Sequence, residues 1–123
     1  MLAYVSGTEQ QDQRIHVLDL ETNATRPVGA GSHDSAPAWS PDGKRIAYHS
    51  KNDPGLVIRV VDIESGEDVV LPHTGGWNHG AQWSTDGCGD AVCAAGVCGR
   101  YIIYTSETGN GLTSRIMVHD TRD

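Results

Sequence analysis

A β-hairpin is recognisable in the sequence at Ala36–Ser50, which reads APAWSPDGKRIAYHS. Two stretches suited to extended backbone, Ala36–Ser40 and Lys44–Ser50, flank the turn segment Pro41–Gly43. Proline fixes φ at the first turn position, aspartate bonds to nearby backbone, and glycine adopts the left-handed conformation without a Cβ clash. The segment therefore predicts two antiparallel strands joined by a tight turn.

This hairpin recurs along the chain, and the recurrence restricts the fold more than any other feature. The segment AQWSTDG at Ala81–Gly87 repeats the first strand and its turn. The second strand returns as RYIIYTS at Arg100–Ser106 and, at the start of the chain, as LAYVS at Leu2–Ser6. The sequence is thus a repeat of one supersecondary unit.

The spacing of the repeat indicates its architecture. Tyr4 and Tyr48 are 44 residues apart (48 − 4), and the two hairpin tryptophans share that spacing (83 − 39). Tyr48 and Tyr104 are 56 residues apart (104 − 48), so the third unit carries 12 additional residues (56 − 44), which we assign to Cys88–Gly99. A period near 44 with four short strands per unit is typical of propeller blades.

The sequence therefore predicts an all-β fold, a partial β-propeller of about three four-stranded antiparallel blades in one domain, residues 1–123. Fifteen glycines and the absence of phenylalanine suit short strands and many turns. The three blades are expected at about residues 1–35, 36–80 and 81–123, with the insertion at 88–99. About ten strands are expected: Leu2–Ser6, Arg14–Leu20, Thr25–Val28, Ala36–Ser40, Lys44–Ser50, Val57–Ile63, Asp68–Leu71, the strand that opens the hairpin copy Ala81–Gly87, Arg100–Ser106 and Arg115–His119.

Charge and hydropathy exclude some functions. The net charge of −7 argues against nucleic-acid binding, which needs a basic face. No apolar run approaches the roughly 18 residues of a membrane-spanning helix. Met1 leads directly into a predicted strand, so no signal peptide is expected within this chain.

The segments AWSPDGKRIAYHS and VIRVVDIESGE resemble the WD40-like repeat of the TolB family of β-propellers. Similar repeats occur in the propeller domains of tricorn-type and prolyl-oligopeptidase-type peptidases and in oligogalacturonate lyases. The second copy departs from the pattern by having Thr85 where the first has Pro41. With strands lettered A to D outwards from the central channel, the resemblance implies the order B-C-D, A-B-C-D, A-B-C.

A rim of polar residues is the first candidate site. Alternating strand direction brings His33, Asp34, Asn78 and His79 to one rim, together with Asn52, Asp53, Glu107 and Asn110. Imidazole and carboxylate together bind divalent metals, and the resemblance to the lyases, which hold a metal with channel-facing histidines, points the same way. The alternative is that these are loop histidines satisfied by backbone groups.

Three cysteines, Cys88, Cys93 and Cys98, fall in the insertion. Their spacing of five residues does not converge three sulfurs on a strand or a helix, and no C-x-x-C pair is present, so a tetrahedral zinc site is disfavoured. One disulfide with one spare thiol is possible in an oxidising compartment, and the pairing stays open.

Aromatic and acidic residues are interpreted by their place in the repeat. Trp39, Trp83, Tyr48 and Tyr104 recur at matching positions and are expected to pack between blades. Trp77 lies outside the pattern and is a candidate contact for a protein partner or a sugar. The aspartates at the ends of the third strands are expected to cap turns by accepting backbone N–H bonds, namely Asp19, Asp62 and Asp120.

No catalytic motif accompanies the repeat, since neither a G-x-S-x-G elbow nor a phosphate-binding loop is present. We therefore expect a non-catalytic scaffold that binds proteins. Incomplete end blades leave faces exposed, which predicts self-association into a ring or a filament. The alternative is a propeller belonging to an enzyme, gating a peptidase or holding a metal as in the lyases. The TolB-like resemblance implies a periplasmic or extracellular location.

Overall fold

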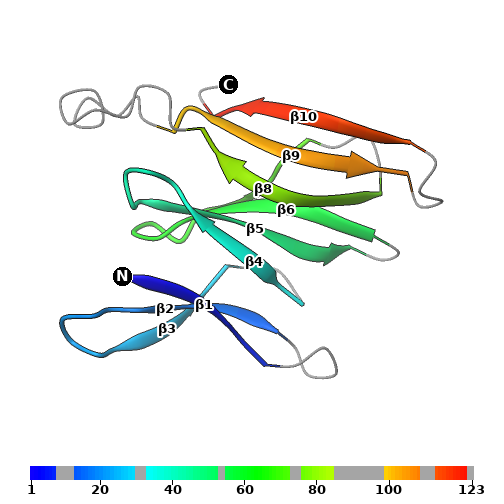
Figure 1. Ribbon diagram of the computed structural model, residues 1–123. Helices are drawn as coiled ribbons and strands as arrows, with labels where there is room; N and C mark the ends of the chain where they lie inside the picture. The colour runs from blue at the N-terminus through cyan, green and yellow to red at the C-terminus, as the bar shows by residue number, and fades with distance from the viewer. Residues whose placement is uncertain are drawn as a thin grey trace.

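The computed structural model describes residues 1–7, 13–29, 33–52, 55–72, 76–84, 99–108 and 113–121. Within these ranges it contains ten strands and no helix, and the strands lie in three layers (Figure 1). The described residues accordingly include no helix long and apolar enough to cross a membrane. The prediction of an all-β fold is confirmed.

Each layer is an antiparallel sheet whose strands follow one another in sequence. The first has the order β1-β2-β3, the second β4-β5-β6-β7 and the third β8-β9-β10, which matches the predicted order B-C-D, A-B-C-D, A-B-C. A single parallel pair, Leu56 with Trp77, joins β6 to β8 and links the second and third layers. The bounds are β1 Leu2–Ser6, β2 Arg14–Leu18, β3 Thr25–Val28, β4 Ser35–Trp39, β5 Arg45–Asn52, β6 Gly55–Asp62, β7 Asp68–Val70, β8 Trp77–Trp83, β9 Tyr101–Glu107 and β10 Ser114–Asp120.

The turn between β4 and β5 forms as its residues predict. Gly43 has φ 73°, and its N–H donates to the Ser40 carbonyl at 2.9 Å. The Asp42 carboxylate accepts from the Ser40 hydroxyl at 2.6 Å and from the Lys44 N–H at 3.1 Å. Burial acts to raise the pKa of Asp42, but these two bonds and the nearby Arg45 charge outweigh it and hold that pKa below its ordinary value.

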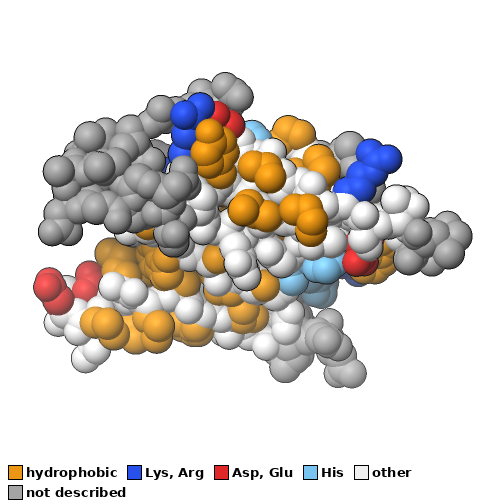
Figure 2. All heavy atoms as spheres, turned by 45° about the horizontal axis from the view of Figure 1, so that its top comes forward, with side chains coloured by type: hydrophobic (Ala, Val, Ile, Leu, Met, Phe, Trp, Pro, Cys, Tyr) orange, Lys and Arg blue, Asp and Glu red, His pale blue; other side chains and the backbone are white. Residues whose placement is uncertain are grey.

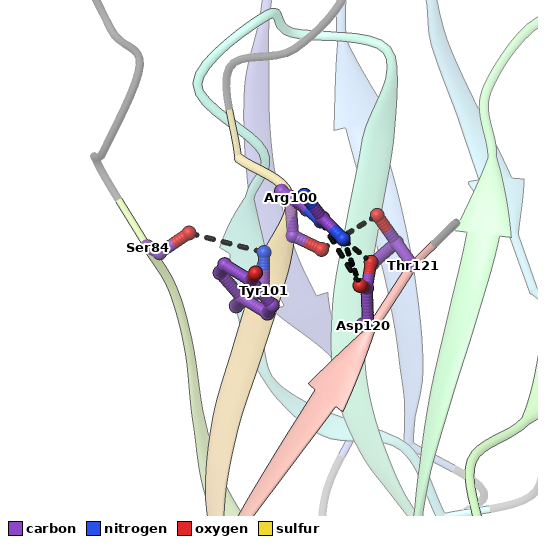
Figure 3. A network of polar contacts seen from close by, with 5 residues as sticks. All are labelled: Ser84, Arg100, Tyr101, Asp120 and Thr121. Atoms are coloured by element: carbon purple, nitrogen blue, oxygen red, sulfur yellow. Dashed lines mark hydrogen bonds and ion pairs between the residues drawn. The ribbon is translucent and has the colours of Figure 1, made fainter. Parts of the chain in front are cut away.

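A serine closes this hairpin in both copies of the repeat. The Ser40 hydroxyl oxygen accepts the Arg45 N–H at 3.0 Å, and Ser84, 44 residues later (84 − 40), accepts the Tyr101 N–H at 3.0 Å. Figure 3 shows the second serine beside β9. The hairpin is therefore closed in the same way in the third layer, although its connection contains the additional residues.

Two of the three expected aspartate caps are confirmed. Asp19 accepts the Glu21 N–H at 2.9 Å, and Asp62 accepts the Ser65 N–H at 2.8 Å. Asp120 instead ion-pairs with Arg100, whose Nη2 lies 2.6 Å from its Oδ2 (Figure 3). The residues that a cap at Asp120 would reach, 122 and 123, lie outside the described part of the chain.

The start of β8 differs from the prediction. The strand begins at Trp77, within a segment expected to be a crossing, because it contacts β6 of the preceding layer: Gly76 accepts the Leu56 N–H at 2.8 Å. A register shift between His79 and Gln82 then bends the strand around Gly80, whose φ is 70°. The equivalent strand β4 has the same irregularity.

The hydrophobic core lies between layers in two clusters. The first joins the first two layers and the second joins the last two, so each layer is buried by its neighbours. Ile15, Val17, Val28, Ile46, Tyr48, Val61 and Ile63 form the first cluster, and Ala47, Ile58, Val60, Leu71, Trp83, Ile102 and Tyr104 form the second. The expected packing of the recurrent aromatics between blades is confirmed.

A buried polar network fixes the outer part of the second layer. The Tyr48 hydroxyl donates to Asp68, and the Arg59 Nε donates to the other oxygen of that carboxylate at 2.8 Å. Burial and the bond to Asp68 raise the pKa of Tyr48, so this phenol stays protonated as a donor. Gly29, at the end of the first layer, lies directly over the Tyr48 hydroxyl.

Gly29→Ala is expected to destabilise the protein more than Gly66→Ala. Both glycines have positive φ, 87° and 78°, so each alanine costs about 1 kcal/mol of backbone strain. At Gly29 the new Cβ would also lie 2.5 Å from the Tyr48 hydroxyl oxygen, whereas at Gly66 nothing lies within 4 Å. Overpacking adds about 1–3 kcal/mol at the first site. Urea unfolding of the two variants measures this, and equal losses would contradict the close packing at Gly29.

Candidate interaction surfaces

The structure buries two of the four residues predicted for a metal site. Asp34 and Asn78 are fully buried, whereas His33 and His79 are partly exposed. Asp34 and Asn78 are 44 residues apart (78 − 34) and so occupy equivalent positions of the repeat, a correspondence that the sequence analysis missed because it compared the two histidines. The 44-residue spacing that relates Tyr4 to Tyr48 also relates Asp34 to Asn78, and it is the sequence signal that identifies this pair.

Both residues fasten the start of one layer to the layer before it. The Asn78 Nδ2 donates to the Leu56 carbonyl at 2.8 Å. At the equivalent position, the Asp34 N–H donates to the Gln13 carbonyl at 2.9 Å. The position therefore acts as a clasp between layers.

The Asp34 side chain does not make the hydrogen bond to the preceding layer that the Asn78 Nδ2 makes. Both of its carboxyl oxygens are buried, and neither has a partner at hydrogen-bonding geometry. Burial raises the pKa of Asp34, against the opposing effects of the neighbouring Ser50 hydroxyl and the Arg14 charge. At the clasp position the side chain has to donate a hydrogen bond to a carbonyl, as Asn78 does. A carboxylate has no proton to donate.

Among the described residues of this rim, Ser35 and His49 form a contact of the kind that a nucleophile makes with its base. Ser35 Oγ and His49 Nε2 are hydrogen-bonded, and burial together with the His79 charge lowers the pKa of His49. Its Nδ1 is buried without a partner among the described residues, so the acid that orients the imidazole in a triad is not seen there. The other histidine of this pair, His79, lies beside a carboxylate: its Nε2 is 3.5 Å from Glu107 Oε2.

The remaining predicted site residues stay predictions. No group of three or more His, Cys, Asp or Glu side chains within the described ranges is arranged to hold a metal ion. Trp77 is exposed at the start of β8, where a partner or a sugar has access to it. Asp53, Asn110 and the cysteines Cys88, Cys93 and Cys98 lie outside the described residues.

An apolar surface covers the outer face of the third layer. Ile103 of β9 pairs with Val118 of β10, and Ile116 follows on the same face; these side chains are 42%, 62% and 70% exposed. Figure 2 shows hydrophobic side chains gathered over these two strands. We call Ile103, Ile116 and Val118 the end face.

The residues equivalent to the end face in the second layer are buried in the contact between two layers. The residues equivalent to the end face in the second layer are Ala47, Ile58 and Val60, which are 56 or 58 positions earlier (103 − 47, 116 − 58, 118 − 60). All three are at most 7% exposed because the third layer packs over them. The end face is therefore a packing surface of the same kind, left uncovered within the described chain.

The other end of the molecule has the reciprocal surface. Leu2 and Tyr4 in β1 are equivalent to Ile46 and Tyr48 in β5 (46 − 2, 48 − 4), which are fully buried against the first layer. Leu2 is 52% exposed. The chain thus exposes one example of each of the two faces that pack together at its internal layer contacts.

Comparison with known proteins supports the TolB-like resemblance. No protein-family profile matches the chain. It is 33% identical over 70 residues to the Tol-Pal system protein TolB of Alkalilimnicola ehrlichii, a match that covers 57% of this chain and 16% of that protein. The chain spans under a fifth of the length of the curated relatives that it matches.

Solved propeller structures match almost the whole chain. A protein from Agrobacterium tumefaciens assigned as a TolB superposes with a TM-score of 0.73 and 25% identity, over 98% of this chain and 38% of its own. The β-propeller domain of the trilobed protease from Pyrococcus furiosus gives a TM-score of 0.70 with 20% identity, over 98% and 34%. The chain is a TolB-like partial β-propeller.

Asp34→Asn is expected to stabilise the protein at pH 7 by about 1 kcal/mol, the value of one buried hydrogen bond. The new amide has an N–H donor, which the carboxylate lacks, and can donate a hydrogen bond to the preceding layer as the Asn78 Nδ2 does to the Leu56 carbonyl. Because the folded pKa of Asp34 is raised above 3.8, ionisation of this group lowers stability as pH rises through that folded pKa. The advantage of the variant should therefore be smaller at pH 4 than at pH 7, as measured by urea unfolding.

The reverse substitution, Asn78→Asp, is the matched control and should destabilise at pH 7, because it removes the donor to Leu56. A loss of stability in Asp34→Asn at pH 7 would contradict the clasp interpretation and would favour a bound cation at Asp34.

Proposed function

We propose that this TolB-like partial propeller is a non-catalytic scaffold that binds proteins and associates with copies of itself through its end layers. The observation that carries the proposal is the exposure of the end face, whose internal equivalents are buried. Apolar patches of this kind on soluble proteins mark interaction sites. Trp77 adds an exposed aromatic side chain of the type enriched where proteins or sugars bind.

The proposed contact between copies is head-to-tail. The end face of one copy packs against the Leu2 and Tyr4 surface of the next, in the manner of the internal layer contacts. Such a contact uses two different surfaces, so it closes into a ring where the rotation permits and otherwise continues as a filament. The net charge of −7 is screened over about 8–10 Å at physiological salt and does not prevent the contact.

The proposal includes a periplasmic or extracellular location, as expected from the TolB-like resemblance. The three cysteines of the insertion are then in a compartment where one disulfide and one thiol for another chain are compatible with the redox state.

Ile116→Glu is expected to weaken self-association at least tenfold, because it places an unpaired carboxylate in an apolar contact. Analytical ultracentrifugation of the wild-type chain over a range of concentrations should give a mass that rises above that of the 13.2 kDa monomer. The variant should remain monomeric over the same range.

Leu20→Glu is the control, since Leu20 is as exposed as Ile116 but lies in the turn between β2 and β3, away from the end face. It should associate as the wild type does. A wild-type chain that stays monomeric at all concentrations, while remaining folded, contradicts the self-association.

The alternative function is that of an enzyme-associated propeller, gating a peptidase or binding a metal. The support for this alternative is the shared fold with the propeller domain of the trilobed protease. A shared fold does not by itself determine function. Elemental analysis separates the metal-binding form from the scaffold, because one equivalent of manganese or zinc per chain would support a site at the rim of His33, Asp34, Asn78 and His79. The scaffold proposal predicts metal well below one equivalent after dialysis.

A further inference from the structure

Two equivalent tryptophans differ in one hydrogen bond. The Trp83 Nε1 donates to the Ala38 carbonyl of β4 at 2.9 Å, which joins the A strand of the third layer to that of the second. Trp39 lies 44 residues earlier, at the same position of β4. Its Nε1 is buried and has no partner among the described residues. A buried indole N–H normally has an acceptor, and the described residues supply none beside Trp39.

Two equivalent glycines differ in the same way. Gly99, which the sequence analysis counted with the insertion, lies two residues before β9 just as Gly43 lies two residues before β5, and their φ angles are 71° and 73°. They are 56 residues apart (99 − 43), the spacing of Tyr48 and Tyr104. A Cβ at Gly99 would lie 2.6 Å from Pro41, in the turn of the preceding layer. At Gly43 a Cβ would meet nothing within 4 Å. The turn of the second layer thus lacks the neighbour that the third layer has.

A cleft occupies the position of these missing neighbours. It measures about 320 Å³ and is lined by Met1, Trp39 and Gly43. Met1 is the equivalent of Arg45 (45 − 44), whose guanidinium stacks over the Trp83 ring at 4.7 Å. The side chains that frame the contact are therefore present, and the strand that would supply the carbonyl is not among the described strands.

The open edge of β1 borders this cleft. β1 pairs with β2 along one edge, and no described strand pairs with its other edge. In the second layer the corresponding edge of β5 is paired with β4, with Ala38 opposite Ala47 and Trp39 opposite Ile46. A strand bound to β1 in the same register would place those two positions opposite Ala3 and Leu2.

We propose that the edge of β1 and the cleft at Trp39 form a slot that binds an extended polypeptide segment, with a small residue followed by an aromatic one, as a fourth strand of the first layer. The backbone carbonyl of a small residue accepts the Trp39 Nε1–H, and an aromatic residue follows it, as Ala38 and Trp39 do in β4. Main-chain pairing to the strand edge supplies affinity, and the indole bond fixes the register.

A second copy of this chain is a poorer occupant than a separate extended segment. Its two A strands, β4 and β8, are already paired with β5 and β9, and releasing either one breaks a ladder and exposes a core tryptophan. An extended segment with no prior pairing has no such ladder to lose.

The test uses the peptide DSAPAWSP, which has the sequence of residues 34–41, added unlabelled to the ¹⁵N-labelled chain. The three indole N–H resonances are assigned by single Trp→Phe substitutions. Binding at the slot should move the Trp39 indole proton downfield and slow its exchange with solvent, while the Trp83 indole stays unchanged. A peptide of the same residues in scrambled order is the control and should leave all three indoles unmoved.

Trp39→Phe keeps an aromatic side chain, although a smaller one, and removes the indole N–H donor, so it should weaken peptide binding about fivefold, the effect of one neutral hydrogen bond. Trp83→Phe, which loses an internal bond instead, should bind the peptide as the wild type does. The proposal is overturned if saturating peptide leaves the Trp39 indole unmoved in the folded wild-type chain. It is also overturned if that resonance shifts with protein concentration alone and peptide does not compete, because a second copy then fills the slot.

Discussion

Packing between successive layers is the interaction on which the rest of this structure depends. A single four-stranded sheet cannot bury both of its faces, and here the core residues fall into two clusters that each span two layers. Tyr48 and Tyr104 are the centres of these contacts, fully buried against the layer before them, and each hydroxyl finds an acceptor, at Asp68 and at the Pro72 carbonyl. Stability is therefore a property of neighbouring layers and not of one layer alone.

The features that sequence predicted well are those determined within one repeat. The hairpin at Pro41–Gly43 depends on residues at most a few positions apart, so its turn and its strands follow from local chemistry. The serine closure was not predicted, although it is equally local in the second layer, and in the third layer Ser84 makes it across the longer connection. The aspartate caps at Asp19 and Asp62 are equally local.

The features that sequence missed arise between repeats. β8 begins at Trp77 because Gly76 and Asn78 bond to Leu56 of the preceding layer, and no pattern within residues 72–80 indicates that contact. The clasp position was hidden for a related reason: the conspicuous histidines His33 and His79 are not equivalent, whereas the less conspicuous Asp34 and Asn78 are. Aligning the chain on its own period, rather than searching it for ligand types, identifies the pair.

The two end surfaces also differ from the internal faces in opposite ways. Where the first two layers have Ala3 and Ala47, the third has Ile103, so the end face carries three more carbon atoms at that point. Among the described strands of the first layer, none carries the equivalent of Trp39 and Trp83, so the described outer surface has less bulk than the internal faces. A contact between copies therefore joins a fuller surface to an emptier one, and a strand bound at β1 would remove that match. Strand binding at the slot and self-association through the end face are accordingly expected to compete, because both change how much space is left beside Leu2.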